Sequence, residues 1–133
     1  MNEDLLQYIW RYQRFKGNLA TIDGKELEIK YSGVYNTNAG PDFQGAKVRI
    51  ADTLWAGNVE VHLRSSDWFA HSHQLDRAYD NIILHVVYEH DREIIDKHGN
   101  VIQTLELKEF VDDELIAKYQ VFIKNKDWIP CIG

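Results

Sequence analysis

Three polar side chains that suit chemistry alternate along one short segment of the sequence. Successive side chains of a β-strand point to opposite faces, so Glu60, His62 and Arg64 are predicted to share one face. The residues between them are apolar and should face the core: Val59, Val61 and Leu63. A carboxylate, an imidazole and a guanidinium side by side suit metal binding and activation of water, although such a face can also simply meet solvent.

A second carboxylate, Asp42, ends a loop of turn-forming residues at 36–42. The alternation at residues 46–50 predicts a strand directly after this loop. If that strand pairs with the strand over 58–65 through a turn at 53–57, its start lies beside the end of the next strand, and Asp42 and residues 60–64 are expected to meet at one edge of the sheet. Two carboxylates next to a backbone carbonyl form the hard oxygen site that Mg²⁺ or Mn²⁺ prefers. The expected chemistry is metal-assisted phosphodiester hydrolysis.

The two segments together, Gly40-Pro41-Asp42 and Glu60-Val61-His62, resemble the catalytic signature of the PD-(D/E)XK nuclease superfamily. The resemblance implies that Asp42 and Glu60 bind the metal ion and that His62 takes the place of the lysine of that signature. Histidine can act as a general base near neutral pH but lacks the fixed charge of lysine. Arg64, on the same face, is the expected source of that charge.

Four further segments resemble the N-terminal part of an uncharacterised bacterial family, a domain of unknown function whose members are longer than this chain. They are Tyr8-Ile9-Trp10, residues 39–43, residues 54–62 and residues 78–81. This resemblance covers essentially the whole sequence and brings no established activity. It predicts that residues 1–133 form a single domain at the N-terminus of a longer protein. The alternative for the apolar end, residues 128–133, is a short strand that docks on the core.

The expected elements alternate between helices and strands. Helices are predicted over 3–15, over 67–79, and from Asp112 or Asp113 onward; strands are predicted within a hairpin at 20–35 and over 46–50, 58–65, 81–88 and 101–107. Such an order predicts an α+β fold in which a mixed central sheet is flanked by helices. The order of helix, three strands, helix and strand also resembles a restriction-endonuclease-like core.

The histidines outside this strand offer accessory groups. His71, His73 and Asp76 fall close together on a predicted helix, where they either form a solvated polar face or cover the same site. His85 interrupts a strand that is otherwise apolar, so it is either a hydrogen-bonded core histidine or a proton carrier beside His62.

Composition restricts the class of protein. The 133 residues suit one domain, and the single cysteine, Cys131, excludes an internal disulfide bond. No signal peptide or membrane span is recognisable, so a cytoplasmic protein is expected. A net charge of −6 argues against a protein that coats nucleic acid, but residues 1–70 are almost neutral, with eight Lys and Arg against nine Asp and Glu. Nucleic acid therefore remains a candidate substrate.

Three functions follow from these observations. The first is a Mg²⁺-dependent nuclease or related phosphodiesterase. The second is a non-catalytic module with a nuclease-like fold that binds nucleic acid or a protein. The third is a transition-metal hydrolase that uses histidine ligands, because imidazole suits zinc better than magnesium.

Overall fold

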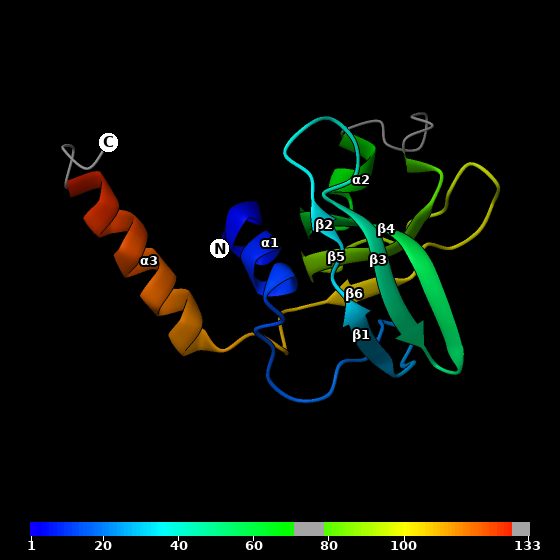
Figure 1. Cartoon of the computed structure of the whole chain (residues 1–133), viewed down its shortest axis with the longest axis horizontal. Helices are drawn as coiled ribbons and strands as arrows, with labels where there is room; N and C mark the ends of the chain where they lie inside the picture. Colours follow the sequence, from blue (N-terminus) through cyan, green and yellow to red (C-terminus); the bar gives the residue numbers. More distant parts are fainter. Residues whose placement is uncertain (71–78, 129–133) are drawn as a thin grey trace.

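The protein has a mixed α+β fold with an open, mixed β-sheet and a few helices, seen in a computed structural model that describes residues 1–70 and 79–128 (Figure 1). The elements in chain order are α1 (Glu3–Arg11), β1 (Leu27–Tyr31), β2 (Val34–Tyr35), β3 (Phe43–Ile50), β4 (Thr53–Arg64), α2 (Asp67–Ala70), β5 (Ile82–Glu89), β6 (Thr104–Glu106) and α3 (Asp113–Trp128). This order confirms the predicted α+β class.

The sheet changes from antiparallel to parallel pairing at its middle strand. Its order is β1-β3-β4-β5-β6, with the short β2 paired to β3. The pairs β1–β3, β2–β3 and β3–β4 are antiparallel, whereas β4–β5 and β5–β6 are parallel. The longest strand, β4, therefore joins both halves, and its parallel neighbour β5 requires a crossover connection, which begins with α2.

Helix α1 covers one face of the sheet because one stripe of its side chains is apolar. Asn2 caps the helix, its Oδ1 accepting a hydrogen bond of 2.9 Å from the backbone N–H of Leu5. The buried stripe consists of Leu5, Leu6, Ile9 and Trp10. Burial of each such side chain contributes about 1.5–3 kcal/mol, so α1 is held mainly by this face.

The opposite face of β4 and β5 is also covered. Trp68 of α2 is buried and its ring centroid lies 5.2 Å from that of His85 on β5. Trp68 belongs to a second, smaller cluster with Ile94 and Ile102. Residues 83–87 are all buried, which confirms the prediction of a strand buried on both faces.

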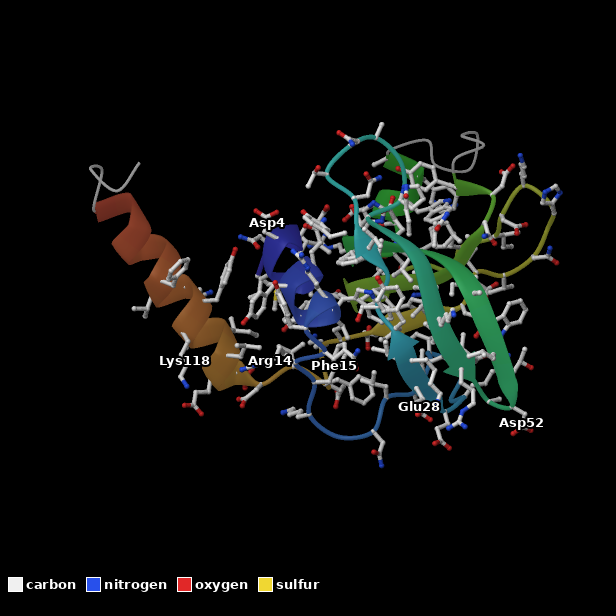
Figure 2. All side chains as sticks on the ribbon, viewed as in Figure 1. Asp4, Arg14, Phe15, Glu28, Asp52 and Lys118 are labelled. Atoms are coloured by element: carbon white, nitrogen blue, oxygen red, sulfur yellow. The ribbon has the colours of Figure 1, made fainter. Side chains whose placement is uncertain are left out.

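One predicted turn lies elsewhere in the structure. The turn between β3 and β4 was expected at 53–57 but consists of Ala51 and Asp52, because Ile50 already pairs with Thr53. Figure 2 shows Asp52 at the tip of this hairpin. Ala51 adopts a φ of 52°, a left-handed conformation that Gly or Asn usually signals, so the sequence carried no warning of a tight turn.

The predicted hairpin at 20–35 is also wrong as a pair of strands. Its Asp23-Gly24 turn is present, with Gly24 at a φ of 84°, but the pairing around it is limited to an isolated bridge between Ala20 and Glu26 and a few backbone hydrogen bonds. The strand after the turn, β1, pairs instead with β3. That pairing buries Leu27 opposite Ile50 in the main core, which a local hairpin would not do.

Helix α3 extends away from the sheet (Figure 1). Asp112, one of the two residues predicted as its cap, begins this helix. Its Oδ1 accepts a hydrogen bond of 2.9 Å from the backbone N–H of Glu114. Leu115, Ile116 and Tyr119 pack against the main core, whereas Val121 and Phe122 are exposed. Its first half therefore anchors the helix.

A hydrogen-bonded clamp joins the end of β4 to the end of β5. The Asp91 carboxylate accepts hydrogen bonds from the hydroxyls of Ser65 (2.9 Å) and Ser66 (2.7 Å) and from the backbone N–H of Ser66 (2.9 Å). The buried Ser65 hydroxyl accepts in turn from the N–H groups of Asp91 and Arg92. Burial alone would raise the pKa of Asp91, but these hydrogen bonds outweigh it and lower the pKa to about 2.

We expect Asp91→Asn to lower the free energy of unfolding by about 1 kcal/mol at pH 7, a figure reduced for the exposure of this carboxylate. A lowered pKa means that the stabilisation is complete above the ordinary pKa of aspartate and is lost as the pH falls towards 2. Urea unfolding at pH 7 and near pH 3 measures both effects. Asp52→Asn, an exposed aspartate at the hairpin tip, is the control; an equal loss in both variants would contradict the clamp.

Candidate functional site

Asp42 is fixed at the start of β3 by hydrogen bonds from two other elements. Its Oδ2 accepts a hydrogen bond of 2.9 Å from the backbone N–H of Val61 on β4. Its Oδ1 accepts one of 3.2 Å from the Gln7 side chain on α1. The antiparallel register pairs Phe43 with Val59, which brings the preceding Asp42 beside Glu60.

Glu60 lies directly beside Asp42. Its Oε1 accepts a hydrogen bond of 3.2 Å from the Asp42 backbone N–H. Only 3% of Glu60 is exposed, so the alternative that this face simply meets water does not hold at Glu60. Asp42 and Glu60 are therefore neighbours across β3 and β4.

Burial raises the pKa of the Glu60 carboxyl, and the negative charge of Glu3 on α1 adds to this effect, although hydrogen bonds from Asp42 and Val61 oppose it. Two neighbouring carboxylates repel each other unless a proton or a cation lies between them. The pair therefore favours a positive charge between its oxygens, either a proton or a cation.

This pKa predicts a pH dependence for the protein in a metal chelator. Because the pKa of Glu60 is raised on folding, the folded state binds more protons than the unfolded chain, and the free energy of unfolding falls as the pH rises through that pKa. We expect Glu60→Gln, whose amide oxygen can still accept from Asp42, to abolish this fall and to raise the melting temperature at pH 8. Thermal unfolding of both proteins from pH 4 to pH 8 measures this; a lower melting temperature for Glu60→Gln at pH 8 would contradict it.

His62 and His85 form a buried pair next to the carboxylates. His62 Nδ1 and His85 Nε2 lie 2.7 Å apart, and the ring planes are nearly perpendicular at 85°. The two residues are 3% and 0% exposed. His85 is thus a core histidine hydrogen-bonded to a neighbour. Because that neighbour is His62, the position of His85 also suits a proton carrier beside His62.

The remaining predicted residues are more remote or lie elsewhere. Arg64 is exposed at the end of β4, about 13 Å along the strand from Glu60. Its backbone N–H donates a hydrogen bond to the Asp67 carboxylate. In the β4–β5 register its backbone lies opposite Glu89 of β5. The structure therefore does not bring Arg64 to the carboxylate pair. His71, His73 and Asp76 lie outside the described residues.

Two α1 residues that no sequence motif singled out also contribute to the site. Gln7 donates to Asp42 through Nε2 and accepts a hydrogen bond of 3.0 Å from the Tyr35 hydroxyl through Oε1. Glu3 acts on Glu60 through its charge. Residues four apart share a helix face, so the spacing of Glu3 and Gln7 carried a usable signal that polar residues of α1 face the same place.

Ligand groups for a metal ion are therefore few. In residues 1–70 and 79–128, no group of three or more His, Cys, Asp and Glu side chains is arranged to hold a metal ion. Two carboxylates with oxygen donors remain, at Asp42 and Glu60.

In the same part of the chain no helix is long and apolar enough to cross a membrane.

Comparison with curated proteins and with solved structures gave no match. One family model does match, and it covers residues 3–133. This match confirms the resemblance to a domain-of-unknown-function family over nearly the whole sequence. The chain belongs to the family described as "Protein of unknown function (DUF2851)".

Proposed function

We propose that this protein is a metal-dependent phosphodiesterase of nuclease type, which hydrolyses nucleic acid with Mg²⁺ or Mn²⁺ held by Asp42 and Glu60. The observation that carries the proposal is the hydrogen bond from the Asp42 backbone N–H to the Glu60 carboxyl across β3 and β4, which sets the two acidic residues side by side. Burying Glu60 next to the half-buried Asp42 costs folding free energy. A functional cation between them accounts for such an arrangement.

The donor atoms fit a hard divalent cation. Mg²⁺ is commonly held by one or two carboxylates and keeps several waters, so it does not need a third protein side chain. Asp42 and Glu60 supply that number, and the Gln7 and Val61 hydrogen bonds fix the orientation of Asp42. The bound ion would supply Lewis-acid stabilisation of the negative charge that develops on phosphate.

The order of the elements supports the nuclease-like interpretation. Helix α1 precedes three antiparallel strands, β1, β3 and β4; α2 follows, and β5 then lies parallel to β4. This is the order of helix, three strands, helix and strand that the PD-(D/E)XK resemblance implies. Asp42 directly precedes β3 and Glu60 lies within β4, which resembles the signature's aspartate at the start of one strand and acid on the next.

His62 occupies the lysine position of that signature. Its ring is oriented by the hydrogen bond between its Nδ1 and His85, so proton transfer by His62 would use Nε2. In the proposed hydrolysis a water oxygen attacks phosphorus, its proton passes to His62, and the bond from phosphorus to the leaving oxygen breaks. The leaving oxygen takes its proton from solvent.

The second candidate function is a non-catalytic module that binds nucleic acid or a protein. The observation in its favour is the burial of His62 against His85, in place of a lysine that would reach the carboxylates. A buried imidazole pair cannot supply a fixed positive charge to a phosphate. In this alternative the protein has a nuclease-like fold but does not catalyse hydrolysis.

Incubation with single- and double-stranded DNA and RNA separates these functions. The proposal expects cleavage with Mg²⁺ or Mn²⁺ and none in a chelator. Binding of nucleic acid without cleavage would favour the second function. Zinc bound stoichiometrically to the purified protein would overturn both in favour of a transition-metal hydrolase.

A further inference from the structure

A cavity of about 310 Å³ lies between α1 and β2, on the side of α1 next to Asp42. It is lined by Asp4, Gln7, Tyr8, Arg11, Tyr12 and Tyr35. Figure 2 shows Asp4 at the beginning of α1. The volume is at the lower end of the range for small-molecule sites, roughly 300–1,000 Å³, so one planar ring system fits better than a large ligand.

Aromatic faces and one guanidinium dominate this cavity. The Tyr8 and Tyr12 ring centroids are 5.0 Å apart, and these residues are 38% and 54% exposed. The Arg11 guanidinium carbon lies 5.3 Å from the ring centroids of both Tyr12 and Tyr35. Exposed tyrosines grouped around an arginine form a surface on which flat rings stack.

The cavity is connected to the carboxylate pair by a single side chain. Gln7 accepts a hydrogen bond from the Tyr35 hydroxyl and donates one to Asp42. Only the Gln7 side chain would thus separate a ligand group in the cavity from a phosphate held at the proposed metal site. Asp4 and Arg11 give the lining one charge of each sign, which suits a neutral base better than a phosphate.

We infer that this cavity, hereafter the tyrosine pocket, binds an unpaired nucleobase of single-stranded nucleic acid next to the phosphate to be cleaved. The inference rests on the proposed function for its substrate class. It adds that the preferred substrate is single-stranded, because a base stacked inside a duplex cannot enter the pocket. It also gives Tyr12 and Arg11 a role in substrate binding that is separate from the chemistry.

The test measures binding without cleavage. A fluorescently labelled single strand of about ten nucleotides, the range that one compact domain covers, is titrated with the protein in a chelator, and its anisotropy is recorded. We expect tighter binding than to the duplex of the same sequence. Tyr12→Ala should weaken binding about tenfold, as expected for loss of one stacked base, whereas Tyr12→Phe should bind like the wild type.

Tyr31→Ala is the matched control, because Tyr31 is a tyrosine of similar exposure, 48%, on β1 and outside the pocket. Equal affinity of the wild type and Tyr12→Ala, preference for duplex, or no binding at all would overturn the inference. Glu60→Gln in the same assay separates the two proposals: wild-type binding in Glu60→Gln that is weakened about tenfold by adding Tyr12→Ala supports the pocket even if no cleavage is found. Cleavage whose KM is the same in Tyr12→Ala and the wild type would leave the proposed function standing and reject the pocket.

Discussion

Replacing Glu60 with glutamine is expected to lower the rate of Mg²⁺-dependent cleavage by about 10³-fold. The change removes one of two proposed metal ligands and keeps the size of the side chain. Metal-ion stabilisation of a reacting phosphate is worth several kcal/mol, and each 1.36 kcal/mol corresponds to about a tenfold change in rate. Initial rates on single-stranded DNA and RNA over a range of Mg²⁺ and Mn²⁺ concentrations measure the loss.

Glu109→Gln is the matched control, because Glu109 is exposed and lies outside the candidate site. It should cleave at the wild-type rate. Asp42→Asn should lose as much activity as Glu60→Gln, and the double variant little more, because both ligands hold the same ion. Wild-type rates in Glu60→Gln would contradict the assignment of Glu60 as a metal ligand.

Trp10→Ala is expected to lower the free energy of unfolding by about 3–5 kcal/mol, the range for deleting a buried aromatic side chain. Trp10 is fully buried, and its indole Nε1–H donates a hydrogen bond of 2.9 Å to the Ser32 carbonyl. The Ser32 hydroxyl donates in return to the Trp10 carbonyl at 3.2 Å. The substitution thus leaves a cavity and removes the partner of a buried carbonyl group.

Urea unfolding followed by circular dichroism measures this loss without relying on tryptophan fluorescence. Phe122→Ala is the control, because Phe122 is an aromatic residue of α3 that is 62% exposed. It should change the stability by less than about 1 kcal/mol. A loss of similar size in both variants would show that α1 is not held by its buried face, and the position of Gln7 would then need another explanation.

Local patterns were enough to predict that the two acidic segments are neighbours. Alternation placed Glu60 on a strand, and the loop before the preceding strand placed Asp42 at its start. The register that sets Asp42 beside Glu60 depends on the turn, which was expected at 53–57 and lies at Ala51 and Asp52, and on the register shift between Phe43 and Ala46. The exact pairing of the two residues was therefore not encoded in the local patterns.

The environment of that face could not be read from the strand itself. Glu60 and His62 are buried next to the parallel strand β5, where His85 lies opposite Glu60 and contacts the ring of Trp68 of α2. The hydrogen bond between His62 and His85 likewise depends on the β4–β5 register, in which Glu60 lies opposite His85. Parallel pairing joins segments far apart in the sequence, and no local spacing encodes its register.

Titration of the protein with Mn²⁺ in a calorimeter tests the proposed metal site most directly, because it needs no substrate and does not depend on the role of His62. We expect one Mn²⁺ to bind per wild-type chain and to be displaced by excess Mg²⁺. Binding should disappear in Asp42→Asn and in Glu60→Gln and persist in Glu109→Gln. Failure of the wild type to bind Mn²⁺, or equal binding by all four proteins, would contradict a metal site at Asp42 and Glu60.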